Sequence, residues 1–82
     1  MSMRMVYEAY SIARAVEVSC GTTPSLREAI EVLEELLHYP SETGLAEQAA
    51  QLLRLAQDEV REMGCLEWYL LGQAVDTLEH IS

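Results

Sequence analysis

The sequence predicts an all-α protein: a compact antiparallel bundle of three to four helices that forms a single domain over residues 1–82. Apolar residues recur at spacings of three and four, which is the period of an amphipathic helix. Regular polar–apolar alternation and runs of β-branched residues, which would predict strands, are absent. A chain of this length can form one domain with a modest core.

The first predicted helix covers about residues 3–19. Gly21 follows it, and glycine suits the left-handed backbone conformation that often ends a helix. The apolar stripe of this helix consists of Met5, Ala9, Ile12, Ala13 and Val16.

The second predicted helix has the clearest boundaries. Thr23 can cap its start, and Pro24 takes the first helical position, where no amide donor is missed. Pro40 ends the helix at His38 or Tyr39. Its apolar face comprises Leu26, Ala29, Ile30, Leu33, Leu36 and Leu37.

The third and fourth helices are predicted over about residues 42–63 and 66–81, with Gly64 between them. The loop 40–44 is short, so the second and third helices are expected to be antiparallel neighbours. The third helix should bury Leu45, Ala49, Leu52, Leu53, Ala56, Val60 and Met63. The fourth should bury Trp68, Leu71, Ala74, Val75, Leu78 and Ile81.

The charge balance restricts the class of partner. Fourteen acidic residues oppose five basic ones, which gives a net charge of −9. Such a field repels phosphates and anionic lipids, so neither nucleic acid nor a membrane is an expected partner. It favours encounter with a basic protein surface.

The two cysteines, Cys20 and Cys65, form no CxxC motif. No signal-peptide pattern or membrane-span pattern is found, so we expect a cytoplasmic protein with reduced thiols. His38 and His80 bring the possible zinc ligands to four, but none of these residues forms a close pair in the sequence. No metal site is therefore predicted.

Enzymatic activity is not expected. Glu35 and His38 match the Glu-x-x-His spacing of di-iron bundles, but the pattern occurs once and on a polar helix face. The sequence contains no phosphate-binding glycine loop, and neither cysteine has an identifiable orienting context. No cofactor is predicted either.

Two helix faces are candidates for binding a partner, although each could also be an ordinary solvated face. Glu34 and three further glutamates lie opposite the apolar face of the second helix, where a basic partner would relieve like-charge repulsion. The polar stripe of the fourth helix follows spacings of four, three and four, and tyrosine is a good interface anchor. The candidate residues are Glu28, Glu31 and Glu35 on the second helix, and Tyr69, Gln73, Asp76 and His80 on the fourth.

Two residues stand in unusual helical positions. Gly72 in mid-helix costs about 1 kcal/mol relative to alanine, which suggests close approach of either a neighbouring helix or a partner loop. Glu59 falls on the apolar edge of the third helix. It should either pair with an arginine or reach solvent, because an unpaired buried carboxylate is costly.

The segment from Thr23 to Pro40 resembles the first helix of the small helical immunity proteins that neutralise type VI secretion effectors of the NAD(P)-glycohydrolase kind. The segment Leu70-Leu-Gly-Gln-Ala-Val75 is similar to a later helix of that family. The resemblance covers about 60 residues and implies occlusion of a toxin's active site without any cofactor. The chain differs from the family in having a helix before Thr23 and in stopping soon after Glu79.

The leading hypothesis is therefore a cytoplasmic immunity protein, or antitoxin, whose carboxylates meet basic residues around the substrate pocket of a toxin acting on NAD(P) or another nucleotide. One alternative is an acidic nucleic-acid mimic of the phage type, although the acids concentrate on the second helix. Another is a helical assembly partner or chaperone, and a homo-oligomer is possible.

Overall fold

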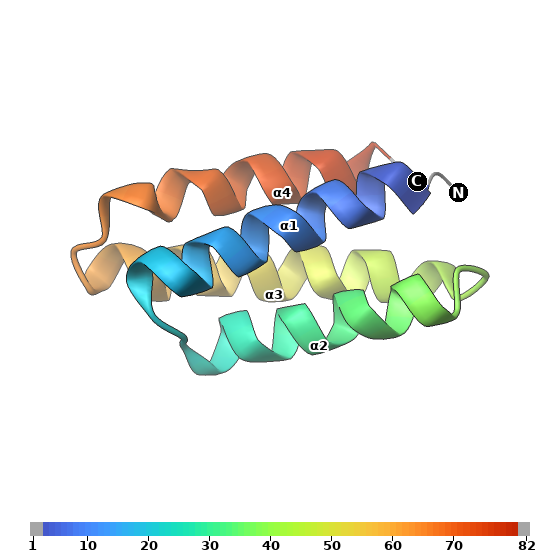
Figure 1. The fold of residues 1–82 in the computed structure, drawn as a ribbon, viewed down its shortest axis with the longest axis horizontal. Coiled ribbons are helices and arrows are strands. Elements are labelled where there is room, and N and C mark those ends of the chain that lie inside the picture. The colour runs from blue at the N-terminus through green and yellow to red at the C-terminus, as the bar shows by residue number, and fades with distance from the viewer. Residues whose placement is uncertain (1–2, 81–82) are drawn as a thin grey trace.

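The structure is a computed structural model that describes residues 3–80, and it is a four-helix bundle (Figure 1). No strand is found among these residues, so the predicted all-α bundle is confirmed. The elements are α1 (Met3–Cys20), α2 (Pro24–His38), α3 (Thr43–Glu62), the 3-10 helix η1 (Leu66–Trp68) and α4 (Tyr69–Glu79).

Successive helices run in opposite directions, so that α1 and α3 end at one end of the bundle and α2 and α4 at the other (Figure 1). Extensive packing joins α1 to α2, α2 to α3, α3 to α4, and α4 back to α1. Helices α2 and α4 therefore lie diagonally across the bundle, which measures 36 × 19 × 17 Å.

The ends of α2 follow the local sequence. The Thr23 hydroxyl accepts a hydrogen bond from the Leu26 amide at 3.1 Å, and Pro24 occupies the first turn. The helix ends at His38, two residues before Pro40. These are the predicted capping and stop signals, and both are confirmed.

The fourth helix differs from its prediction at both ends. Its first turn is the 3-10 helix Leu66–Trp68, and the α-helix begins only at Tyr69. Gly64 precedes it with a positive φ of 83°, which glycine adopts at little cost. Ile81, predicted to face inward, lies outside the described residues.

The core contains most of the predicted apolar positions and corrects a few. In α1, Val6 is fully buried, whereas Met5 and Ile12 are only half-buried, so the buried stripe is shifted toward Val6. Met63 is 54% exposed although its amide still donates to the Glu59 carbonyl, because it caps the end of α3, where less of the bundle covers it. The fully buried large side chains include Leu26, Leu33, Leu36, Leu53, Leu71, Val16 and Val60.

Glu59 has a structural partner that the sequence did not predict. Its carboxylate accepts hydrogen bonds from the hydroxyl and the amide of buried Ser25, at 2.6 and 3.3 Å. It thereby caps the first turn of α2 from the neighbouring helix. The hydrogen bond from the Ser25 hydroxyl, followed by one from Thr23, lowers the pKa of Glu59 against the opposing effect of desolvation.

We expect Glu59→Gln to lower the free energy of unfolding at pH 7 by about 1 kcal/mol, the usual value of a helix cap. Because the folded pKa lies below its ordinary value of 4.5, the carboxylate stabilises the fold fully above that value. This stabilisation is lost as the pH falls through the folded pKa. Urea unfolding of the variant should therefore depend less on acid pH.

The control is Glu62→Gln, at an exposed position on the same helix. It should change neither the stability nor its dependence on pH. Equal pH dependence of wild-type protein and Glu59→Gln would contradict the assigned cap.

Candidate functional site

The acidic ridge, defined as Glu28, Glu31 and Glu35, lies on the outer surface of α2. All three side chains are exposed, and among the described residues none has a hydrogen bond or ion pair. Glu34 differs, because its carboxylate accepts a hydrogen bond from the Tyr10 hydroxyl of α1 at 2.9 Å. The ridge thus presents carboxylates that can accept bonds from outside the molecule.

Helix α3 adds carboxylates beside α2, to which it is closely packed. The acidic side chains exposed on α3 are Glu47, Asp58 and Glu62. Exposed acidic residues are therefore not concentrated on α2 alone, as the sequence had suggested. Two neighbouring helices carry exposed negative charge.

The α4 stripe, defined as Tyr69, Gln73, Asp76 and His80, is also exposed along its whole length. The ring Nδ1 of His80 lies 2.6 Å from the Asp76 carbonyl oxygen, which orients the imidazole along the helix. Tyr69 is 53% exposed and offers a large side chain for contact.

Gly72 is adjacent to this stripe and faces Gln57 of α3. A Cβ at this position would meet the amide group of Gln57 on α3 at 3.4 to 3.7 Å. These are ordinary van der Waals distances, so α3 lies beside Gly72 but leaves room for a methyl group. Packing against α3 therefore does not require a glycine here, and close approach of a partner loop stays a prediction.

The structure does not bring the two predicted binding groups together. The acidic ridge lies on α2 and the α4 stripe on α4, and these helices are diagonal to one another. A partner surface of ordinary curvature that contacts one group would meet α1 or α3 before it reached the other. The two groups are separate candidate patches.

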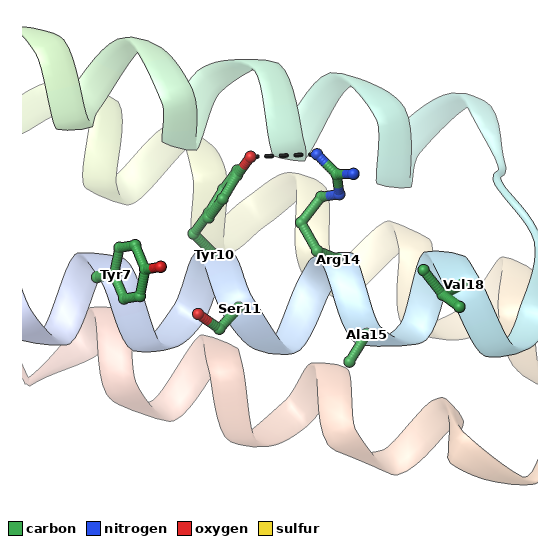
Figure 2. Close-up of a pocket in the computed structure, with 6 residues that line it drawn as sticks. All are labelled: Tyr7, Tyr10, Ser11, Arg14, Ala15 and Val18. Atoms are coloured by element: carbon green, nitrogen blue, oxygen red, sulfur yellow. Dashed lines mark hydrogen bonds between the residues drawn. The ribbon is translucent and has the colours of Figure 1, made fainter.

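The outer face of α1 carries a shallow hollow of about 410 Å³ that the sequence analysis did not identify (Figure 2). It is lined by Tyr7, Tyr10, Ser11, Arg14, Ala15 and Val18. Tyr7 and Val18 are 61% and 81% exposed although both are large. Both residues lie off the apolar stripe of α1, and this position could have indicated an exposed apolar surface.

Arg14 and Tyr10 form the polar side of this hollow (Figure 2). Arg14 donates to the Tyr10 hydroxyl at 3.2 Å and lies 3.3 Å from the Glu17 carboxylate. The hydrogen bond with Tyr10 is the main cause of a raised pKa of Arg14, and the charge of Glu17 adds to it. These contacts fix the side chains but include no nucleophile beside a base.

Cys20 and Cys65 form a disulfide with a Cα–Cα distance of 5.6 Å, so the prediction of reduced thiols is wrong for this structure. Cys20 is the last residue of α1, and Cys65 follows α3. Both helices finish at the same end of the bundle (Figure 1). The alternating helix directions therefore bring together residues that are 45 positions apart. The disulfide could have been predicted from this topology, but not from any local motif.

The histidines do not join this cysteine pair. His38 ends α2 and His80 follows α4, at the opposite end of the bundle from α1's last residue (Figure 1). The four possible zinc ligands considered from the sequence therefore do not converge. Instead, the carboxylate of Glu67 lies beside the sulfurs, with Oε2 at 3.0 Å from Cys65 Sγ and 3.8 Å from Cys20 Sγ.

Comparisons with known proteins do not identify the chain. No protein-family model, no curated protein and no solved structure matches it. Within residues 3–80, no helix has both the length and the apolarity that crossing a membrane requires.

Proposed function

We propose that this protein is an immunity protein that binds a secreted bacterial toxin domain and occludes its active site. The acidic ridge carries the proposal: three exposed carboxylates lie on one helix with no partner among the described residues. Like charges at this spacing repel, and an approaching basic surface removes that cost. The resemblance of the segment from Thr23 to Pro40 to a family of immunity proteins supports the same function.

The target in this proposal is a toxin acting on NAD(P) or another nucleotide, because a pocket for an anionic substrate is lined by basic residues. The net charge of −9 speeds encounter with such a pocket. Helix α2 holds the acidic ridge rigidly, since its first turn is capped by Thr23 and Glu59. The bundle acts by excluding substrate and performs no reaction itself.

The α4 stripe is a second patch in this proposal, led by Tyr69. Its diagonal position means that it contacts either a different part of a concave toxin surface or a second molecule. In this proposal, type VI secretion delivers the toxin, as the resemblance implies, and the immunity protein meets it in the cytoplasm.

Charge reversal tests the acidic ridge. We expect Glu31→Lys to weaken binding to the cognate toxin domain, sought among those encoded by neighbouring genes, about tenfold, mainly through a slower association rate. The control is Glu8→Lys, which makes the same charge change at an exposed position of α1 outside both patches and should have a smaller effect. Binding should be measured by calorimetry or surface plasmon resonance at two salt concentrations.

Two outcomes would contradict the proposal. Tight binding that Glu31→Lys leaves unchanged would exclude the acidic ridge as the contact surface. Failure to bind or inhibit any toxin domain encoded nearby would exclude the immunity function.

A nucleic-acid mimic is the second candidate function, and it is favoured by the exposed carboxylates that α3 carries in addition to those of α2. A mimic should displace duplex DNA from a basic host protein, whereas an immunity protein should not. An assembly partner, the third candidate, would use exposed apolar residues such as Val18. Light scattering would then show a stable oligomer.

A further inference from the structure

Three side chains from separate segments meet at the end of the bundle where α1 and α3 finish. Cys20 is the last residue of α1, Cys65 lies between α3 and η1, and Glu67 belongs to η1. Their two sulfurs and one carboxylate oxygen all lie within 4.8 Å of one another. Neither the acidic ridge nor the α4 stripe includes any of them.

The position of Glu67 suits a reduced cysteine pair better than the disulfide. A disulfide sulfur has neither a proton nor a positive charge to offer the carboxylate oxygen, which lies 3.0 Å from Cys65 Sγ. Among the described residues, no ion pair between an arginine and this carboxylate is found, and the Arg61 guanidinium lies over the Trp68 ring at 4.9 Å. A cation held between the three ligand atoms would satisfy all of them.

We propose that the reduced form of this protein binds one Zn²⁺ ion through Cys20, Cys65 and Glu67. Two thiolates and one carboxylate form a three-ligand set, and water fills the fourth tetrahedral position. Ligand–metal distances of about 2.0 to 2.3 Å require ligand atoms roughly 3.5 to 3.8 Å apart, which small side-chain shifts can reach from the observed positions. Thiolates select zinc over Mg²⁺ and Ca²⁺, which prefer oxygen ligands.

The oxidised and zinc-bound forms exclude one another. A dithiol reductant exchanges with the Cys20–Cys65 disulfide, so that both cysteines gain a proton and an electron and the reductant becomes a disulfide. Zn²⁺ then replaces the two thiol protons, which are released to solvent. Either cross-link holds the end of α1 against the segment after α3, so the fold persists in both states.

Metal titration tests the site. Protein reduced with dithiothreitol and desalted without oxygen should bind one Zn²⁺ per chain with release of protons, and Co²⁺ should give sulfur-to-metal charge-transfer absorption. The oxidised protein and Cys65→Ser should lose at least 100-fold in affinity. Glu67→Gln should lose about tenfold, whereas the control Glu62→Gln, an exposed change near the end of α3, should match wild type.

Three results would overturn the proposal. Zinc binding by the reduced wild type that is no tighter than that of the oxidised protein excludes a thiolate site. Equal affinities of Glu67→Gln and Glu62→Gln exclude Glu67 as a ligand. If Cys65→Ser does not fold, iodoacetamide labelling of the reduced wild type decides: Zn²⁺ must protect both cysteines, and unprotected cysteines reject the site.

Discussion

Reduction of the Cys20–Cys65 disulfide is expected to lower the free energy of unfolding by about 4 kcal/mol when metal is absent. The bond joins residues 45 positions apart, and a loop of that length loses roughly this much freedom in the unfolded chain. A domain of this size has a total stability of about 4 to 12 kcal/mol, so the effect is large. It should unfold a substantial fraction of the reduced protein at modest denaturant concentrations.

The measurement is guanidinium unfolding followed by circular dichroism, with and without dithiothreitol and with a chelator present. The double variant Cys20→Ser/Cys65→Ser is the control, and its midpoint should not respond to the reductant. A difference below about 1 kcal/mol between oxidised and reduced wild type would contradict the expected entropic effect.

Truncation of Leu53 is expected to have an effect of similar size. Leu53 is fully buried in the middle of α3, where the helix packs against both α2 and α4. Leu53→Ala removes buried methyl groups and leaves a cavity, which together cost about 2 to 5 kcal/mol. The variant should unfold at a markedly lower denaturant concentration than wild type.

Leu55→Ala is the matched control, because Leu55 lies on the same helix and is 56% exposed. The same substitution there should change the stability by less than about 0.5 kcal/mol. Equal destabilisation by the two variants would mean that α3 presents a different face to the core from the one described.

The sequence predicted the helices themselves because their signals are local. The cap at Thr23 and the stop before Pro40 act within one or two turns, and the start and end of α2 are as predicted. The exposure of Glu31 and Asp76 was also predictable, since helical periodicity places them opposite the apolar faces. Periodicity was less accurate in α1, where it predicted Met5 and Ile12 as core positions and the structure buries Val6 more deeply than either.

The arrangement of the candidate binding residues could not be predicted in this way. Helical periodicity shows which face of each helix is exposed, but it does not show which helices are neighbours. The diagonal placement of α2 and α4 separates the acidic ridge from the α4 stripe. The α1 hollow around Tyr7 and Val18 could not be predicted from the apolar stripe of this helix, because it lies on a different face.

Spacing and composition are enough to predict four amphipathic helices, their approximate bounds and a strongly acidic surface. Contacts between distant segments emerge only from the folded bundle: the disulfide, the cap formed by Glu59 on Ser25, and the contact of Gln57 with Gly72. The physical reason is that these contacts depend on the order and direction in which helices dock. Docking is set by packing of the whole core, which no short segment encodes.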